Sequence, residues 1–374
     1  MTFFSKIFDK KEEPSVLGID IGSSAIKIVQ IKKKRGQAIL ETYGELALGP
    51  YGGHGIGQAV VLPTEKISEA LANLIKEKEV NITTNKCGLS IPFASSLMSL
   101  VEMPQVSDKQ LAIMVPIEAR KYIPVPISEV MLDWSVIPKS EVGLNNVESQ
   151  GIGEPSKPLT PKIDVLVVAI HNDTIARYKE IVAKIDLDAS FFEIEIFSTM
   201  RAVLDDSLSP VMILDMGAAS TKVYIVERGI VRESHTINRG SQDITLTLSS
   251  SLGIPPDKAE IMKRQLGVTG GDKTFTEVIT LTLDFIFAEA NQTLLSYEKK
   301  YNKAVSKVIL VGGGSALKGV APLAEVSFKT PSVTGNPFNK LSTPAFLENV
   351  LKETGPEFAV AIGLALRRLA EEES

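Results

Sequence analysis

The stretch that decides the fold occurs twice: it reads VLGIDIGSSAIKIVQIKKKRGQ at Val16–Gln37 and VMILDMGAASTKVYIVERGI at Val211–Ile230. Each copy has an apolar segment, then Asp-x-Gly, four small or apolar residues and a lysine. A second apolar segment and a basic turn with glycine follow. The aligned pairs are Asp20 and Asp215, Gly22 and Gly217, and Lys27 and Lys222. Alternating β-branched residues on both sides of the turn predict that each copy is a β-hairpin.

The chemistry of such a hairpin suits phosphate. Small residues let the backbone come close to a ligand, and successive N–H groups at the turn form a concave anion site. An aspartate on the entering strand can hold Mg²⁺ through water, because this ion prefers oxygen ligands and keeps several waters. A single Asp-x-Gly is equally compatible with a plain tight turn, whereas two copies at matching offsets favour a polyphosphate clamp. We expect Asp20 and Asp215 to be the metal-side carboxylates.

Two further motifs follow the second hairpin. Val308–Leu317, VILVGGGSAL, is an apolar strand that runs into three glycines, which permits close backbone approach to a ligand or forms a tight strand–helix turn. Ile254–Gly267, IPPDKAEIMKRQLG, is predicted to be a helix with prolines at its start and glycine at its end. Glu260 and Lys263 share one helix face, where they either hold two ribose hydroxyls or form a solvated ion pair.

Composition narrows the class of protein. The chain has 374 residues, 44% of them hydrophobic, with 40 basic and 45 acidic side chains and a net charge of −5. These values exclude disorder of the whole chain and give no general attraction to nucleic acid. The single cysteine, Cys87, excludes an internal disulfide and suits a reducing compartment. No apolar run is long enough for a membrane-spanning helix, and the start, residues 1–14, is a short amphipathic segment rather than a signal peptide.

The order of these motifs resembles the actin, Hsp70 and sugar-kinase ATPase superfamily. The resemblance implies an α/β fold of two related ribonuclease-H-like halves around a cleft that binds ATP and Mg²⁺. Both hairpins would contact phosphate, the glycine turn adenosine, Glu260 and Lys263 ribose, and Arg264 adenine. The expected nucleotide-binding residues are Asp20, Gly22, Ser23, Ser24, Lys27, Asp215, Gly217, Ala218, Ser220, Thr221, Glu260, Lys263, Arg264, Gly312, Gly313, Gly314 and Ser315.

Other short segments point to one family within this superfamily. They are Leu89–Pro92 (LSIP), Glu102–Pro104 (EMP), Ile117–Pro124 (IEARKYIP), Leu132–Trp134 (LDW), Asn336–Phe338 (NPF) and Gly363–Arg367 (GLALR). Together they resemble the PilM family of type IV pilus assembly proteins, relatives of the division protein FtsA. The resemblance implies a cytoplasmic scaffold at the inner face of the cytoplasmic membrane. Such a scaffold binds the N-terminal peptide of a PilN-like membrane protein and couples that protein to the assembly motor ATPase or platform protein. The scaffold itself would be a single chain, a homo-oligomer or a ring.

Three functions remain open from the sequence. The favoured one is the ATP-binding scaffold with weak or no ATPase activity, serving a pilus or a related type II secretion machine. An FtsA-like filament protein is the first alternative, and a sugar-kinase-type phosphotransferase is the second. Glu193 or Glu195 is the candidate for positioning water against the γ-phosphate. We expect the partner groove to involve Glu118–Pro126.

The same resemblance predicts the organisation of the chain. The first half should comprise residues 15–84 and 186–209, with an inserted α+β subdomain of the FtsA and PilM type at residues 85–185. The second half should comprise residues 210–240 and 304–374, with a helical lobe at residues 241–303. Two segments have no assigned role: the glycine-rich stretch 51–61 and the polar stretch 139–162, which we expect to be a loop.

Overall fold

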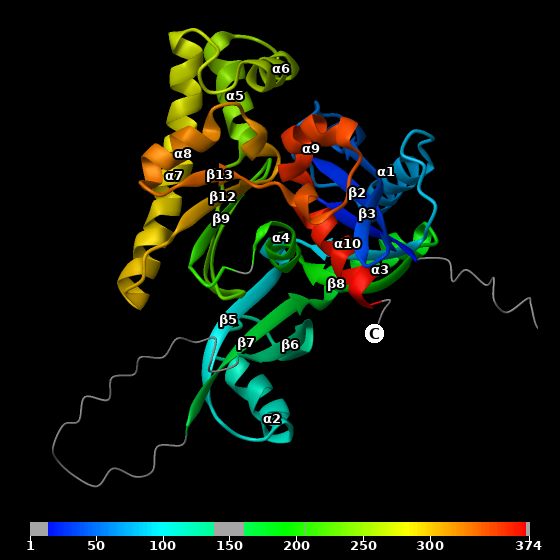
Figure 1. Cartoon of the computed structure of the whole chain (residues 1–374), viewed down its shortest axis with the longest axis vertical. Coiled ribbons are helices and arrows are strands. Elements are labelled where there is room, and N and C mark those ends of the chain that lie inside the picture. Colours follow the sequence, from blue (N-terminus) through cyan, green and yellow to red (C-terminus); the bar gives the residue numbers. More distant parts are fainter. Residues whose placement is uncertain (1–13, 138–160, 206, 372–374) are drawn as a thin grey trace, which may run out of the picture. The chain divides into compact units, whose positions relative to one another are not determined.

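The computed structural model describes residues 14–137, 161–205 and 207–371 (Figure 1). These residues form two compact units, one from the described parts of residues 1–91 and 180–374 and the other from the described parts of residues 92–179. Each unit is described by itself below. Residues 1–13 of the expected amphipathic segment and residues 138–160 of the expected loop lie outside the described part of the chain.

The first sheet of the larger unit has the order β3-β2-β1-β4-β8. Strands β1 (Ser15–Ile21), β2 (Ala25–Lys34) and β3 (Gln37–Ala47) form an antiparallel meander. Strands β4 (Lys86–Ile91) and β8 (Asp188–Ile194) continue the sheet in parallel with β1. Strand β1 is buried along nearly its whole length, as expected for a central strand covered on both faces.

The second sheet repeats this arrangement strand for strand, in the order β11-β10-β9-β12-β13. Strands β9 (Val211–Met216), β10 (Thr221–Glu227) and β11 (Ile230–Ile237) are antiparallel. Strands β12 (Lys307–Val311) and β13 (Ser332–Thr334) run parallel to β9. The two halves expected from the repeated sequence are therefore two sheets with one topology.

Even the turns of the two meanders match. Arg35 and Gly36, between β2 and β3, have φ of 51° and 80°. Arg228 and Gly229, between β10 and β11, have φ of 52° and 76°. Positive φ at both central residues is the geometry of a two-residue type I′ hairpin, which matches the right-handed twist of the flanking strands. The basic turn noticed in both sequence copies is thus a hairpin turn.

The last helix, α10 (Ala359–Glu371), covers the first sheet, although in the sequence it follows the strands of the second sheet. It packs on β1 and on α4 (Glu195–Val203). Glycines permit the close approach: a Cβ at Gly18 would lie 1.9 Å from the Ala361 carbonyl oxygen, and one at Gly363 would lie 1.9 Å from the Ser198 carbonyl oxygen. The expected second half, residues 304–374, therefore includes a helix that covers the first half.

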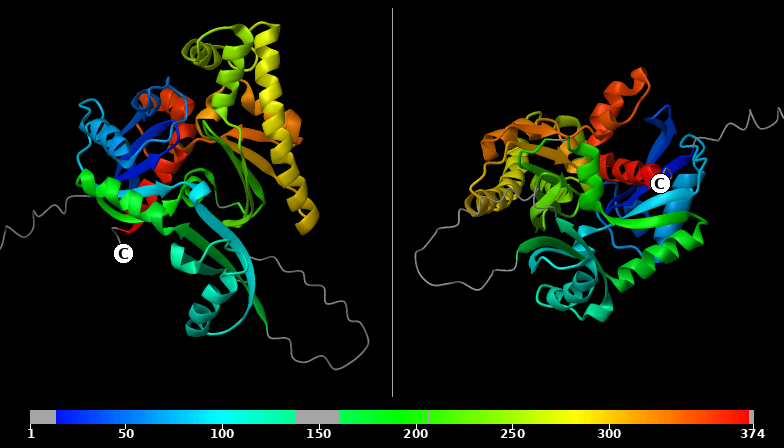
Figure 2. Two further views of the ribbon diagram at one scale, coloured as in Figure 1. Left: turned by 180° about the vertical axis from the view of Figure 1, so that it is seen from behind. Right: turned by 60° about the horizontal axis from the view of Figure 1, so that its bottom comes forward.

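Helices α5 (Ser241–Leu252), α6 (Pro256–Leu266) and α7 (Lys273–Tyr301) occupy the range expected for a helical lobe. The long helix α7, yellow in Figure 1 and Figure 2, packs its buried side on β10 and β11. Helix α8 (Val320–Phe328) packs on α7 and β13, and the short α9 (Glu348–Thr354) precedes α10.

The smaller unit is an α+β module. Strands β5 (Ser96–Pro104), β7 (Lys162–His171) and β6 (Val130–Ile137) form an antiparallel sheet in the order β5-β7-β6. Helix α2 (Asp108–Ala119) contributes Leu111 and Val115 to the same core.

The expected insert, residues 85–185, is wider than this unit at both ends. Strand β4 pairs with β1 and so belongs to the first sheet, because its buried run fits a central parallel strand. Helix α3 (Asn172–Lys184) ends near α1 (Thr64–Lys76), where Lys184 forms an ion pair with Glu65 at 2.8 Å, and both residues belong to the larger unit.

Candidate functional site

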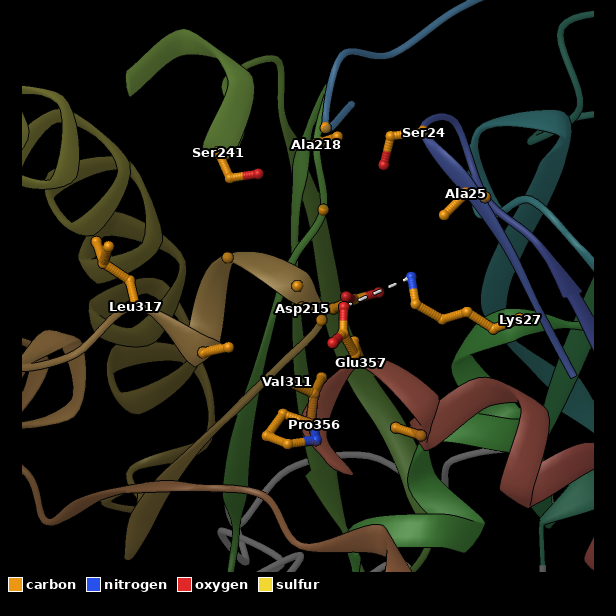
Figure 3. Close-up of a pocket in the computed structure, with 18 of the residues that line it drawn as sticks. Ser24, Ala25, Lys27, Asp215, Ala218, Ser241, Val311, Leu317, Pro356 and Glu357 are labelled. Carbon is orange, nitrogen blue, oxygen red and sulfur yellow. Dashed lines mark ion pairs between the residues drawn. The ribbon is translucent and has the colours of Figure 1, made fainter. Parts of the chain in front are cut away.

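A cavity of about 570 Å³ lies inside the larger unit, and residues from both hairpins line it (Figure 3). The other walls come from α6, from the glycine turn after β12 and from the segment that leads into α10. Motifs that are far apart in the sequence thus meet around one space. A concave site with a few convergent polar groups is the usual form of a small-molecule site.

The first hairpin places a carboxylate and an ammonium side by side. Asp20 on β1 is the direct cross-strand partner of Lys27 on β2, so the two side chains share a face. The Ser90 hydroxyl donates to the Asp20 carboxylate at 2.8 Å. Burial raises the pKa of Asp20 despite this bond and despite Lys27. Lys27 also lies 3.4 Å from Glu45 and 3.9 Å from Glu357, whose carboxylates overcome the effect of burial and raise its pKa.

The second hairpin repeats that arrangement. Asp215 on β9 is the direct cross-strand partner of Lys222 on β10. The Lys222 ammonium lies 3.4 Å from Asp215 and 2.9 Å from Glu195, and these carboxylates raise its pKa against the effect of burial. The spacing of Asp and Lys in the sequence thus corresponds to one structural unit used twice.

The turns of the two hairpins close with the same bond. The Gly22 N–H donates to the Ala25 carbonyl at 3.0 Å, and the Gly217 N–H donates to the Ser220 carbonyl at 3.0 Å. A Cβ at Gly217 would lie 2.9 Å from that carbonyl oxygen, so the turn has little room for a side chain. Figure 3 shows Ser24 and Ala218, one from each turn, in the upper part of the view.

Most of the expected nucleotide-binding residues line this cavity. They are Asp20, Gly22, Ser23, Ser24, Lys27, Asp215, Gly217, Ala218, Ser220, Glu260, Lys263, Arg264, Gly312, Gly313 and Gly314. Thr221 and Ser315 do not line it. The Thr221 hydroxyl donates to the Arg239 carbonyl at 2.9 Å, and the Ser315 hydroxyl donates to the Gly312 carbonyl at 2.7 Å. Both hydroxyls stabilise the local backbone.

Helix α6 presents a buried charged network to the cavity. Glu260 and Lys263 are each 5% exposed and lie 2.6 Å apart. Lys263 also donates to Thr245 at 2.9 Å, and Arg264 donates to Glu260 at 2.7 Å. Burial opposes the charge on Glu260, but Lys263, Thr245 and Arg264 outweigh it and lower the pKa of Glu260. The alternative of a solvated ion pair is therefore wrong for Glu260 and Lys263.

The triple glycine is explained by contact with the second hairpin. Gly312 has φ of 80°, and a Cβ on it would lie 2.6 Å from an Asp215 carboxylate oxygen. A Cβ at Gly314 would lie 2.9 Å from the Met216 carbonyl oxygen. The turn after β12 consequently packs directly against the end of β9, which brings its backbone to the cavity wall.

The two catalytic candidates have different surroundings. Glu193 does not line the cavity: Arg201 and Arg367 donate to its carboxylate, each at 2.8 Å. Burial alone would raise the pKa of Glu193, but these arginines lower it. Glu195 does line the cavity and pairs with Lys222. Of the two, only Glu195 has a geometry that suits water positioning, and that role stays a prediction.

Several residues of the cavity wall were not predicted from the sequence. Glu45 and Glu357 pair with Lys27, while Thr199 on α4 is fully buried, and its hydroxyl has no hydrogen-bond partner among the described residues. Lys222 was not among the expected nucleotide-binding residues either. Its alignment with Lys27 in the repeat is the sequence feature that indicates its place in the site. Glu45, Glu357 and Thr199 belong to no repeated motif, so only the fold brings them to the cavity.

The glycine-rich stretch 51–61 also reaches the cavity. We call residues 49–60 the strap. A Cβ at Gly55 would lie 1.7 Å from an Asp257 oxygen, and one at Gly57 would lie 2.8 Å from a Glu260 oxygen. The Ala59 N–H donates to Gln242 on α5 at 2.9 Å. The strap therefore contacts both α5 and α6 from the first half, and its glycines make that contact sterically feasible.

The cavity fits a hydrated metal better than a fully protein-ligated one. No cluster of three or more His, Cys, Asp or Glu side chains with metal-binding geometry occurs in the described part of the chain. Asp20 and Asp215 both line the cavity, and the charge of Asp215 contributes to the raised pKa of Asp20. Two neighbouring carboxylates without further ligands suit an ion that retains most of its water, as Mg²⁺ does.

None of the helices within residues 14–137, 161–205 and 207–371 has the length and apolar character needed to span a membrane.

Comparison with known proteins gives one family over nearly the whole length. The model of the family "Type IV pilus assembly protein PilM" matches residues 18–369. The cell division protein FtsA of Neisseria meningitidis is 23% identical over 354 residues, which cover 85% of this chain and 82% of FtsA.

The solved structures agree on the fold. A PilM–PilN type IV pilus biogenesis complex superposes with a TM-score of 0.76 at 23% identity, covering 95% of this chain and 98% of that one. MreB5 of Spiroplasma citri, bound to AMPPNP, superposes with a TM-score of 0.51 at 10% identity, covering 96% and 97%. The expected actin-like α/β fold is thereby confirmed. With sheets, hairpins and cavity in this arrangement, and with a match that runs from residue 18 to residue 369, the chain belongs to the PilM family of type IV pilus assembly proteins.

Proposed function

We propose that the protein is an ATP-binding scaffold of the inner-membrane platform that assembles a type IV pilus or a related type II secretion machine. The observation that supports nucleotide binding best is the pair of hairpins, each of which presents an Asp–Lys cross-strand pair to one cavity. Two such pairs match a Mg²⁺–polyphosphate, since lysines attract phosphate and carboxylates attract the hydrated metal.

Each wall of the cavity has a matching part of ATP. Lys27 and Lys222, with the backbone of the two turns, would contact the phosphates. The buried acceptor and donor of Glu260 and Lys263 suit ribose hydroxyls, and Arg264 lies beside them for the adenine. Mg²⁺ would supply charge neutralisation of the phosphates, with Asp20 and Asp215 as the groups that hold its water shell. MreB5, which shares the fold, is solved with AMPPNP.

The ATP proposal has a direct test. Asp20→Asn together with Asp215→Asn should abolish the increase in melting temperature that Mg-ATP produces, because ligand binding to the native state stabilises it by mass action. Asp284→Asn is the matched control, since this exposed aspartate lies on α7 away from the cavity. An unchanged ATP-induced shift in the double variant would refute the assignment of the metal-side carboxylates.

We further propose that ATP acts mainly as a conformational ligand, with hydrolysis slow or absent. Glu195, the carboxylate best placed for water, is held in an ion pair with Lys222 at 2.9 Å. While this pair persists, Glu195 is poorly available for proton transfer, so hydrolysis would require Lys222 to leave Glu195 for a phosphate. A single-turnover measurement with radiolabelled ATP tests this: rapid release of phosphate that disappears in Glu195→Gln would contradict it.

The proposed partner is the N-terminal cytoplasmic peptide of a PilN-like membrane protein. The support is the structural match to a PilM–PilN complex together with membership of the family. The smaller unit offers exposed side chains in the expected segment, Glu118–Pro126: Arg120 and Lys121 are exposed and Tyr122 is 48% exposed. Attachment to the inner membrane through this peptide, and coupling to a motor ATPase or platform protein, would follow from that interaction.

Titration calorimetry with a synthetic peptide of the partner's N-terminus tests the peptide site. We expect micromolar or tighter binding that changes when Mg-ATP is added, and weaker binding by Tyr122→Ala. Phe346→Ala is the control, because it removes an exposed aromatic ring from the larger unit. Absence of binding both with and without Mg-ATP would refute the scaffold, and would favour the FtsA-like filament as the alternative.

A further inference from the structure

Helix α7 carries a second apolar stripe that the core does not use. Its buried side supplies residues such as Phe275, Ile279 and Leu283 to the core of the second half. A different set of residues lies on its exposed side. That set follows the spacing 4, 3, 4, 3 and consists of Leu281, Phe285, Ala288, Gln292 and Leu295.

This spacing is the a/d pattern of a coiled-coil seam. Leu281 is 70% exposed, Phe285 49% and Leu295 54%. Single exposed leucines are ordinary, whereas several apolar side chains in one a/d row indicate an interaction surface. Four of the five side chains here are apolar, Gln292 is polar, and the Arg239 guanidinium lies 5.9 Å from the Phe285 ring centroid. The stripe runs over fifteen residues, Leu281 to Leu295, and its fourteen steps make about 21 Å at about 1.5 Å per residue. Figure 1 and Figure 2 show α7 along the outer edge of the second half.

The two leucines of the stripe are symmetrical about its centre, whereas Phe285 and Gln292 lie three residues before and four residues after it. Ala288 lies seven residues after Leu281 and seven residues before Leu295. A second copy of α7, antiparallel and crossing at Ala288, would therefore place each Leu281 opposite Leu295 of the other copy. The small alanine at the crossing point lets the two helices approach closely.

Charge also favours an antiparallel partner of the same sequence. Exposed Glu277 lies eleven residues before Ala288, and exposed Lys299 lies eleven residues after it. In the antiparallel arrangement Glu277 of one copy faces Lys299 of the other at both ends of the seam. A parallel arrangement would place like charges side by side, which is unfavourable in a coiled coil.

We infer that this stripe, Leu281 to Leu295, is a homodimerisation surface through which two copies pair by antiparallel contact of α7. Five side chains from each copy are fewer than the roughly 20–30 residues a side of a standard interface. The dimer should accordingly be weak, with a dissociation constant in the micromolar range or above. The inference concerns the second half alone and does not depend on the proposed nucleotide or peptide binding.

Sedimentation velocity of the full chain, from low micromolar to several hundred micromolar, tests this pairing. We expect a monomer that becomes a dimer with increasing concentration. Leu281→Glu should prevent the dimer, because it places a carboxylate in the seam at a position that is exposed in the monomer and so leaves folding intact. Phe346→Glu, a similar change at an 83% exposed ring outside α7, should leave the dimer unchanged.

Cysteine cross-linking tests the register. Helices about 9 Å apart, with Cα atoms about 2.3 Å from each axis, would bring the two Ala288 Cα atoms within about 4 to 5 Å, which suits a disulfide. Ala288→Cys should therefore form a covalent dimer on mild oxidation. Leu281→Cys alone should not, but a mixture of Leu281→Cys and Leu295→Cys should. The native Cys87 is buried and does not interfere.

Two results would overturn the inference. One is a chain that stays monomeric at the highest concentration. In that case the stripe would contact a helix of another protein rather than a second copy of this chain. The other is a dimer that forms equally well in Leu281→Glu, or that cross-links through Leu281→Cys alone, since either would place the contact elsewhere or in another register.

Discussion

Replacement of Gly57 by alanine tests how the strap serves nucleotide binding. Gly57 lines the cavity with φ of 82°, and an added Cβ would lie 2.8 Å from a Glu260 oxygen. The Glu260 carboxylate cannot easily rotate away, because Lys263, Thr245 and Arg264 all bond to it. Alanine must therefore displace either the strap or the carboxylate that we assign to the ribose.

The size of the effect follows from two separate contributions. A non-glycine residue in the left-handed region costs about 1–2 kcal/mol, which should lower the free energy of unfolding. Loss of one or two hydrogen bonds from Glu260 to ribose, at about 0.5–1.5 kcal/mol each, should weaken ATP binding by roughly 2- to 150-fold. Only the second contribution acts on the ligand.

Gly53→Ala separates the two contributions. Gly53 also belongs to the strap and has φ of 75°, but a Cβ there would meet nothing within 4 Å. Both variants should lose a similar amount of stability, and only Gly57→Ala should lose ATP affinity in titration calorimetry. Inorganic tripolyphosphate should bind both variants like the wild type, since it has no ribose. Equal ATP affinity in the two variants, or an equal loss for tripolyphosphate, would refute this reasoning.

Three further predictions concern single groups. Glu193→Gln should lower the free energy of unfolding by about 1–3 kcal/mol, because it leaves two partly exposed arginines without their carboxylate, yet it should leave ATP affinity unchanged in calorimetry. Burial raises the pKa of the Cys87 thiol to about 12, so a thiol reagent should label it only on unfolding, and Mg-ATP should slow the labelling. Because burial raises the pKa of Asp20 in the folded state, protonation stabilises the ligand-free protein as pH falls, and that stabilisation is lost as pH rises through the raised value. Mg-ATP affinity should show the opposite trend and fall on acidification, and Asp20→Asn should abolish both dependences.

The hairpins were predictable because everything that defines them is local. The Asp–Lys spacing fixes a cross-strand pair, and the glycines fix the turn, so sequence alone locates the lining residues Asp20, Lys27, Asp215 and Gly217. The helix with Glu260 and Lys263 was equally local. Its burial was not, because it depends on how α6 packs on α5, and this burial excludes a solvated ion pair.

The rest of the site depends on contacts between distant parts of the chain. Glycine is required at positions 55 and 57 only because α6, two hundred residues later in the chain, lies against them. Glu357 reaches Lys27 because α10 packs on the first sheet rather than on the second. The boundary of the insert was misplaced for the same reason: β4 is assigned by its partner β1, and a single strand does not reveal its partner.

We expect the proposed nucleotide to change the structure when it binds, because the lysines of the cavity are already paired with carboxylates. Lys27 is already engaged by Glu45 and Glu357, and Lys222 by Glu195. A triphosphate is strongly negative, so it can enter this carboxylate-lined space only if Mg²⁺ neutralises it and the lysines exchange carboxylate partners for phosphate. Lys27 and its partners belong to the first half and to the segment before α10, while Lys222 belongs to the second. An exchange on both sides at once would draw the two hairpins toward one ligand, which is the response expected of a conformational ligand rather than of a permanent structural cofactor.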